Sequence, residues 1–202
     1  MKKAVIVSST LIFCMSALAV RARAQGQGAF PELNFSATEV VTAPDGKTTS
    51  MKIYRLGDKM RTDMPGGKMH TLFFMRERKA YMVMPQMCMQ MPQMANLRAQ
   101  PLAATGSVTR KDLGSAVVDG HPTKIVQITV TPAGGGKPMT MKTWEATDLK
   151  DFPIRIQTQT PKGPATIDYK DVNLSSPASS LFAVPQNCRT MPMMPGMPHP
   201  GQ

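Results

Sequence analysis

The sequence predicts a mainly β protein with a strongly curved antiparallel sheet. Between Asn34 and Leu174 the chain consists of short segments that are rich in β-branched residues or alternate apolar with polar residues. Asp-Gly, Gly-Asp and Gly-Gly pairs separate these segments at the spacing typical of hairpin loops. No segment in this range has the length and periodicity of an ordinary helix, so the prediction is one meander of about ten strands.

The first strands follow one another closely along residues 35–91. Their turns are DG, GD and PGG, and the last pair closes around Pro85 and Gln86. Each gap has the length that a hairpin loop needs, so neighbouring segments are expected to pair as antiparallel strands. In chain order, these predicted strands are FSATEVVTAP, KTTSMKIYRL, KMRTDM, KMHTLFFMRE, KAYMVM and MCMQM.

A second series of strands covers residues 114–174. Its turns include DGHP, GGG and PKGP, which are rich in the residues that turns require. The same antiparallel meander is therefore expected to continue through this half of the chain. The predicted strands are GSAVV, TKIVQITVTP, PMTMKTWEA, FPIRIQTQT and ATIDYKDVNL.

Two short helices and a tail are expected outside the strands. Residues 91–100 carry good helix formers, and Ser176 followed by Pro177 offers an N-cap and a first helical position. In residues 189–202, prolines and glycines interrupt every regular element. This last segment is predicted to be a disordered tail rich in Met and Pro.

One strand is apolar on both of its faces. Leu72, Phe73, Phe74 and Met75 follow one another, whereas apolar and polar residues alternate in a half-exposed strand. A strand of this kind is covered on both sides. The sheet is therefore predicted to wrap around an interior, with further chain packed against it.

Residues 1–24 are predicted to be a cleaved secretory signal. Two lysines precede the apolar segment AVIVSSTLIFCMSALAV, and ARA precedes Gln25, which gives the three parts of such a signal. Cys14 offers lipidation as an alternative, but Phe13 stands where a small residue normally precedes a lipidated cysteine. The protein is expected to be periplasmic or secreted, with one domain at residues 25–188 and no transmembrane segment after cleavage.

Charge and motifs argue against several classes of function. The net charge is +11 at pH 7, but the lysines and arginines are scattered singly, which argues against binding of nucleic acid. The sequence contains no Gly-x-Ser-x-Gly, His-Glu-x-x-His or phosphate-loop motif, and its three histidines are far apart. No enzyme activity is therefore predicted.

Two cysteines, Cys88 and Cys188, remain after cleavage of the signal. An even number of cysteines in an exported protein usually forms disulfides. A bond between Cys88 and Cys188 is therefore predicted, with two independent thiols as the alternative.

Several segments together resemble a known family. FSATEVV, DGKTTSMKIYRLGDKMRTDM, DGHPTKI and YKDVNLSSPASSLFAVP are similar, in this order, to exported bacterial proteins related to the LolA/LolB-type lipoprotein-sorting proteins. The resemblance covers Phe35 to Pro185 and implies an incomplete β-barrel, whose curved sheet holds an apolar cavity closed by short helices. In the sorting proteins this cavity takes acyl chains. The chain departs from the family in its methionine-rich segments and in lacking a usable LolB-type lipidation site.

The methionines of residues 82–94 are interpreted first as cavity wall. Met82 and Met84 share one face of a strand, and the methionines at 87, 89 and 91 share one face of the next. A flexible thioether fills irregular space and adapts to varied apolar ligands. Together with the two-sided strand, the residues predicted to line the cavity are Leu72, Phe73, Phe74, Met75, Tyr81, Val83, Met87, Met89, Met91 and Trp144.

The methionines of the tail have no core to fill, because prolines keep them out of regular structure. Thioethers favour Cu(I), and a histidine adds a nitrogen ligand. The residues of this candidate copper site are Met191, Met193, Met194, Met197 and His199. The alternative is a tail of low complexity under no functional constraint.

These observations lead to three hypotheses for function. The first is a non-enzymatic exported protein, without a resident cofactor, that binds an acyl chain or another apolar ligand in the cavity of its sheet. The second is a periplasmic Cu(I)-binding protein that uses the methionines of the hairpin and the tail. The third is a structural or interaction protein of the cell envelope. The sequence leaves the ligand and the oligomeric state open.

Overall fold

The structure is a computed structural model that describes residues 32–91, 106–132 and 136–190. The described chain forms one sheet of twelve strands and two short 3₁₀ helices, η2 (Thr147–Leu149) and η3 (Ser179–Phe182). The strands are β1 (Phe35–Thr42), β2 (Thr48–Leu56), β3 (Lys59–Asp63), β4 (His70–Phe74), β5 (Lys79–Met84), β6 (Met87–Gln90), β7 (Gly106–Val118), β8 (His121–Pro132), β9 (Met139–Ala146), β10 (Phe152–Thr160), β11 (Gly163–Asn173) and β12 (Arg189–Thr190).

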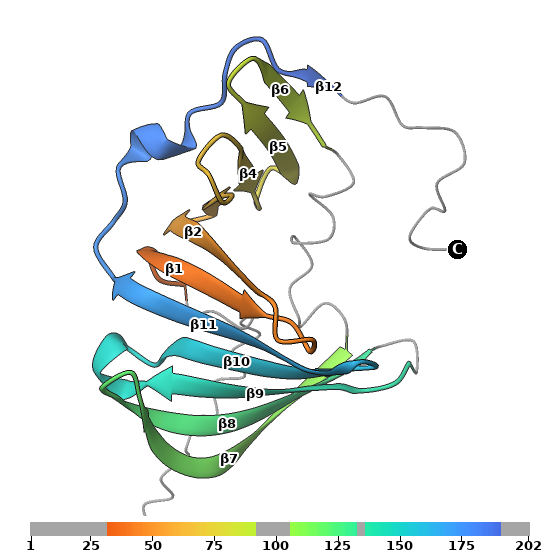
Figure 1. Cartoon of the computed structure of the whole chain (residues 1–202), viewed down its shortest axis with the longest axis vertical. Coiled ribbons are helices and arrows are strands. Elements are labelled where there is room, and N and C mark those ends of the chain that lie inside the picture. The colour runs from red at the N-terminus through yellow and green to blue at the C-terminus, as the bar shows by residue number, and fades with distance from the viewer. Residues whose placement is uncertain (1–31, 92–105, 133–135, 191–202) are drawn as a thin grey trace, which may run out of the picture.

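The sheet consists of two antiparallel meanders joined side by side. Its order is β12-β6-β5-β4-β3-β2-β1-β11-β10-β9-β8-β7, so β1–β6 and β7–β11 each follow chain order and the junction is the β1–β11 pair (Figure 1). β12 and β7 end the sheet without pairing to each other, so the sheet is not closed into a barrel. The predicted fold class, a mainly β protein with an incomplete barrel, is confirmed.

The predicted turns DG, GD, PGG, DGHP and PKGP, which lie within the described residues, connect strands of the sheet. Between β7 and β8, Asp119 and Gly120 both have positive φ, 52° and 84°, as the tight type I′ hairpin turn requires. Glycine adopts this conformation without steric cost, which is why the Asp-Gly pair was a reliable turn signal.

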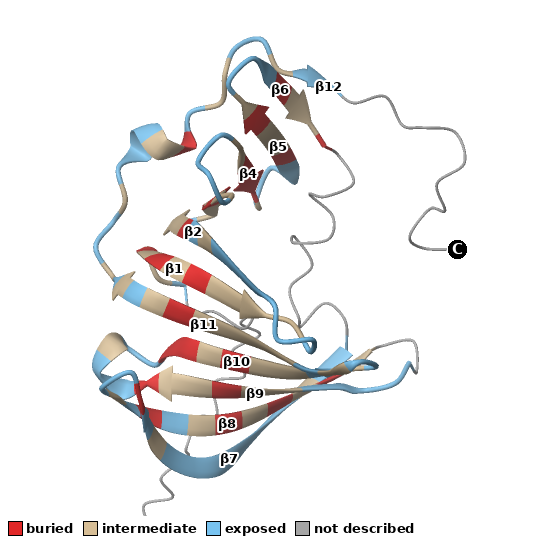
Figure 2. Cartoon of the chain, in the orientation of Figure 1, coloured by how far each residue is buried: buried red, intermediate tan, exposed pale blue. Residues whose placement is uncertain are grey.

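The sheet has two faces with different partners. Much of the main apolar cluster lies on one face, including Ile53, Met60, Phe73, Ile156 and Tyr169. A second cluster on the opposite face comprises Leu72, Phe74, Val83 and Cys88, with Tyr81, Val184 and Cys188 packed against it. Because Leu72, Phe73 and Phe74 are all buried, the prediction that β4 is covered on both sides is confirmed (Figure 2).

The segment from Leu174 to Thr190 crosses the second face, and we call it the strap. After β11 it passes η3 and reaches β12 beside β6, at the other end of the sheet (Figure 1). Arg61 on β3 donates a hydrogen bond from Nη1 to the carbonyl oxygen of Leu181, at 2.9 Å. The strap therefore supplies the cover that the two-sided strand requires.

The predictions for the ends of the elements need three corrections. The N-cap at Ser176 and the helix start at Pro177 are wrong, because η3 begins at Ser179 after Ala178, and the Ser176 hydroxyl instead accepts a hydrogen bond from Asn34 Nδ2. The tail does not begin at residue 189, because the strap brings Arg189 and Thr190 alongside β6.

The third correction concerns β7, which begins at Gly106, eight residues before the predicted start. Charged residues at 110–112 hid its strand pattern. They are tolerated because β7 is an edge strand that is exposed along most of its length (Figure 2). Of the predicted helix at 91–100, only Met91 lies within the described residues.

Candidate ligand-binding face

Methionines gather on the face of the sheet opposite the strap. Side chains alternate along a strand, and residues opposite each other in the register share a face. Following the register from β9 through β10, β11, β1, β2, β3, β4 and β5 to β6 places nine methionines on this face, which we call the methionine face. They are Met51, Met60, Met82, Met84, Met87, Met89, Met91, Met139 and Met141.

The β5–β6 hairpin carries the densest part of this face. Met82 lies opposite Met89, and Met84 lies opposite Met87. Met87 is 46% exposed, whereas Met82, Met84 and Met89 are half-buried. Met91 follows β6, donates its backbone N–H to the carbonyl oxygen of Ala80 and is buried. The register agrees with the prediction that Met82 and Met84 share a face, as do Met87, Met89 and Met91. It also places these two groups on the same face of the sheet.

Two buried threonines interrupt the apolar surface next to the hairpin. Ile53, Thr62, Thr71, Met82 and Met89 form one row across β2 to β6. Thr62 and Thr71 are each 3% exposed. The Oγ1 atom of Thr62 is buried and has no hydrogen-bond partner among the described residues. A buried hydroxyl group without a partner is unfavourable, so this position is a polar point within an apolar face.

The candidate cavity residues divide into two groups. Phe73, Met87, Met89 and Met91 lie on the methionine face. Leu72, Phe74, Tyr81 and Val83 lie on the opposite face, in the second apolar cluster, which the strap covers. The predicted cavity-lining residues therefore do not line one cavity. They lie on the two opposite faces of the sheet.

Met75 and Trp144 belong to neither group. Met75 lies in the turn after β4, where its N–H donates to the carbonyl oxygen of Asp58. Met141 and Trp144 are three residues apart on β9 and therefore lie on opposite faces of the sheet. Trp144 thus points away from the methionine face, and it packs at the margin of the main cluster. The cations of Lys142 and Arg155 lie 4.6 and 5.9 Å from its ring centroid.

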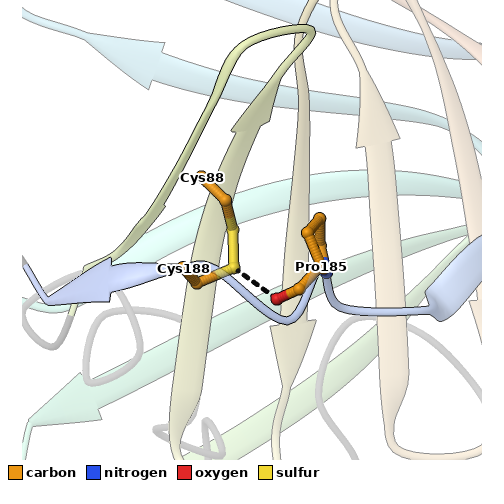
Figure 3. The surroundings of a disulfide bond; sticks show 3 residues. All are labelled: Cys88, Pro185 and Cys188. Atoms are coloured by element: carbon orange, nitrogen blue, oxygen red, sulfur yellow. Dashed lines mark hydrogen bonds between the residues drawn. A yellow bond between two sulfur atoms is a disulfide. The ribbon is translucent and has the colours of Figure 1, made fainter.

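The predicted disulfide is present between Cys88 of β6 and Cys188 of the strap (Figure 3). Cys188 Sγ also lies 3.1 Å from the carbonyl oxygen of Pro185, a sulfur–oxygen contact, because a disulfide sulfur has no proton to donate. The bond covers the Cys88 side of β6 and leaves the methionine side free of the strap.

A hollow of about 480 Å³ lies at the tip of the β5–β6 hairpin, mainly on the strap side of the sheet, to which Arg61, His70 and Val83 belong by the register. Its size falls within the range of small-molecule sites. Apolar and basic side chains meet in it, together with Pro185 and Asn187 of the strap. The charged or apolar lining side chains are Arg61, Lys68, His70, Val83, Met84, Met87 and Cys88.

The electrostatics of this hollow favour an anion. Arg61 is held by Asp63, with Nε and Oδ1 2.6 Å apart. Burial lowers the pKa of His70 below its usual value, and the Arg61 cation lowers it further, so the imidazole is neutral at pH 7. Lys68 is exposed and pairs with no carboxylate in the described part of the chain, which leaves an ammonium group open to a ligand.

A second hollow, of about 490 Å³, lies at the edge of β8, β9 and β10 and is lined from both faces of the sheet, with Gln127, Lys142 and Gln157 on the face opposite the methionines. Met139 and Met141 line it together with Thr158 of β10. Met139 is 53% exposed. Methionines therefore reach solvent at both ends of the methionine face, and one exposed thioether lies at each hollow.

The described residues lack a cluster of common metal ligands and a helix long enough to span a membrane. Three or more His, Cys, Asp or Glu side chains placed to hold a metal ion do not occur among them. Their helices are too short to cross a membrane. The candidate copper ligands at residues 191–199 lie outside the described part of the chain, so their arrangement remains a prediction.

The sequence matches no family model and no curated protein. Similar solved structures include the lipoprotein LppX of Mycobacterium tuberculosis, with 12% identity over 70% of this chain and 88% of its own, at a TM-score of 0.40. LprF of Mycobacterium bovis has 13% identity over 72% and 90% of the two chains, also at 0.40. A LolA superfamily protein of Nitrosomonas europaea has 12% identity over 77% and 92%, at 0.36.

Proposed function

We propose that this chain is an exported, non-enzymatic binding protein that holds an acyl chain or another apolar ligand against its methionine face. The observation that carries the proposal is that nine methionines of the strands β9 to β6 lie on one face of the sheet, where Met87 near one end and Met139 near the other are exposed. Exposed apolar surface of this kind marks binding sites. Thioether chains are flexible and polarisable, so such a surface adapts to ligands of varied shape.

The hollow at the hairpin tip supports a ligand with a negatively charged end. Met84 and Met87 line this hollow together with Lys68 and Arg61. A fatty acid or an anionic phospholipid would place its chain along the methionines and its charged group at the hairpin tip, where Met84 and Met87 border the hollow and the Lys68 ammonium. Zwitterionic lipids would gain less from this end of the site.

Binding of an environment-sensitive fatty-acid probe tests the proposal. The probe is expected to bind saturably and to be displaced by phospholipid, and displacement by anionic lipid should weaken in the Lys68→Glu variant. Met87→Glu and Met139→Glu each place a charge on the apolar face and are expected to weaken the binding of the probe by about tenfold or more. Val117→Glu is the matched control, because Val117 is 72% exposed on the edge strand β7.

Linear uptake of probe that phospholipid does not displace would contradict the proposal, since it would mean that the face is filled by the protein's own side chains. Native mass spectrometry of protein purified from its own cell envelope shows where the mature chain begins and whether lipid is bound. A mature chain beginning at Gln25 with co-purified lipid is the expected species. An intact leader would refute export by signal cleavage.

A further inference from the structure

The β5–β6 hairpin combines four thioethers in a small area. Residues directly opposite each other on antiparallel strands have Cβ atoms about 5 Å apart, and next-but-one residues of a strand are about 7 Å apart. The two cross-strand pairs, Met82 with Met89 and Met84 with Met87, therefore occupy a patch of about 5 by 7 Å. Each methionine has three rotatable side-chain bonds, so the four sulfurs can turn towards a common point above the patch.

From this arrangement we propose a binding site for a soft monovalent metal, Cu(I), formed by Met82, Met84, Met87 and Met89. Thioethers select Cu(I), whereas Zn(II) and Mg(II) require imidazole, thiolate, carboxylate or water ligands. On the same face, the adjacent positions of β4, β5 and β6 hold Thr71, Ala80 and Met91, none of which is a carboxylate or an imidazole. The donor set of the patch is therefore soft.

The exposure of the four residues fits a site that a metal can enter. A purely structural wall would bury its methionines, yet Met87 is 46% exposed and the other three are only partly covered. Burial alone does not explain a methionine in this position, because its apolar surface remains in contact with water. An exposed thioether at the tip of a hairpin provides the first ligand for an arriving ion.

The hairpin is held rigidly from its other face. Cys88, between Met87 and Met89, points to the strap and is bound to Cys188, so it is not a free thiolate that would compete for the metal. β12 pairs with Met89 and Gln90 of β6. Fixing the backbone of both strands reduces the conformational entropy that is lost when four flexible side chains converge on one ion.

This site shares the hairpin methionines with the apolar-ligand proposal but does not rest on it, and it differs from the candidate tail site. In our proposal Met82, Met84, Met87 and Met89 of the hairpin form the site, and all four lie within the described residues.

The test compares thioethers with hydrocarbon of similar size. Met82, Met84, Met87 and Met89 are replaced together by Leu, which keeps an apolar wall but removes every sulfur donor of the hairpin. The matched control is Met139→Leu with Met141→Leu, which removes two thioethers from the same face at its other end. A third protein ends at Thr190. Cu(I) is titrated without oxygen against a chromophoric chelator, and X-ray absorption identifies the ligand atoms.

The expected result is one tight site with a sulfur-only shell in the unaltered protein. The hairpin variant should bind Cu(I) at least about tenfold more weakly, roughly 1.4 kcal/mol, while the β9 control stays unchanged and the shortened protein loses less than tenfold. Saturable fatty-acid binding by the hairpin variant would show that its fold and apolar wall are intact, which separates failure of this site from failure of the proposed function.

Three results would overturn the proposal: equal Cu(I) affinity in the hairpin variant, loss of the site on shortening alone, or Zn(II) bound as tightly as Cu(I). Should the fourfold variant fail to fold, the unaltered protein with ¹³C-labelled methionine methyl groups gives the answer by titration with Ag(I), a redox-stable substitute. The methyl signals of Met82, Met84, Met87 and Met89 should then shift before those of Met139 and Met141. A shift confined to other methionines would refute the site.

Discussion

Thr62 and Thr143 are buried threonines on the same face of the sheet, and their hydroxyl groups have different surroundings. Thr143 is fully buried and donates a hydrogen bond to the carbonyl oxygen of Val126, at 3.2 Å. The hydroxyl of Thr62 is buried without a partner in the part of the chain that is described. A hydroxyl in this condition loses its hydration and gains nothing in return. Such a position is either a cost to folding or a contact kept for a polar group of a ligand.

Replacing Thr62 by Val separates these two roles. Valine has the same shape without the hydroxyl, so the variant is expected to be as stable as the parent or up to about 1 kcal/mol more stable. Thermal unfolding measures the change. Thr143→Val is the control and should lose about 1 kcal/mol, because a made hydrogen bond is removed. If Thr62→Val is destabilised as much as the control, the hydroxyl has a partner; if only ligand affinity falls, the hydroxyl binds ligand.

The strap is the element whose path local sequence patterns predict least. Hairpins could be predicted from local signals, because turn pairs such as Asp119-Gly120 impose a specific backbone geometry. Alternation also predicted which hairpin methionines share a face. The path of residues 174–190 depends instead on distant contacts, among them the hydrogen bond from Arg61 and the bond to Cys88. A helix signal at Ser176 and Pro177 was therefore overridden by the tertiary requirement to cover β4.

The disulfide is expected to stabilise the strap and the sheet together. It closes a loop with a sequence separation of 100 residues, for which the chain-entropy estimate is about 4.7 kcal/mol and typical measured values are about 2–4 kcal/mol. Replacing Cys88 and Cys188 together by Ser should lower the melting temperature by several degrees. Reduction of the parent protein should give the same shift and leave the double variant unaffected. An unchanged melting temperature, with two titratable thiols in the native parent, would show that the bond does not form.

The two meanders depend on one strand pair for their connection within the sheet. β1 pairs with β11, and the strands are more than a hundred residues apart in the chain. The hydroxyl of Tyr169 on β11 donates to Glu39 Oε2 on β1, at 3.0 Å, and both side chains are buried. Local patterns predicted each meander but not this junction, because a pairing between distant strands leaves no periodic signal in the sequence. Neither did they indicate why a glutamate lies in the middle of an apolar face.

Removing the Tyr169 hydroxyl tests whether the two meanders unfold as one unit. Tyr169→Phe keeps the edge-to-face contact with Phe152 but leaves the buried Glu39 carboxyl group without this donor, at an expected cost of about 1–3 kcal/mol. Trp144, the single tryptophan, reports on the second meander, and far-ultraviolet circular dichroism reports on the whole sheet. If β1 and β11 couple the meanders, both signals shift to lower denaturant together and remain coincident. Tyr54→Phe on β2, whose hydroxyl has no hydrogen bond to the described residues, should change the stability by less than about 0.5 kcal/mol. Separation of the two transitions in Tyr169→Phe would show that the meanders fold independently and that the junction only holds them side by side.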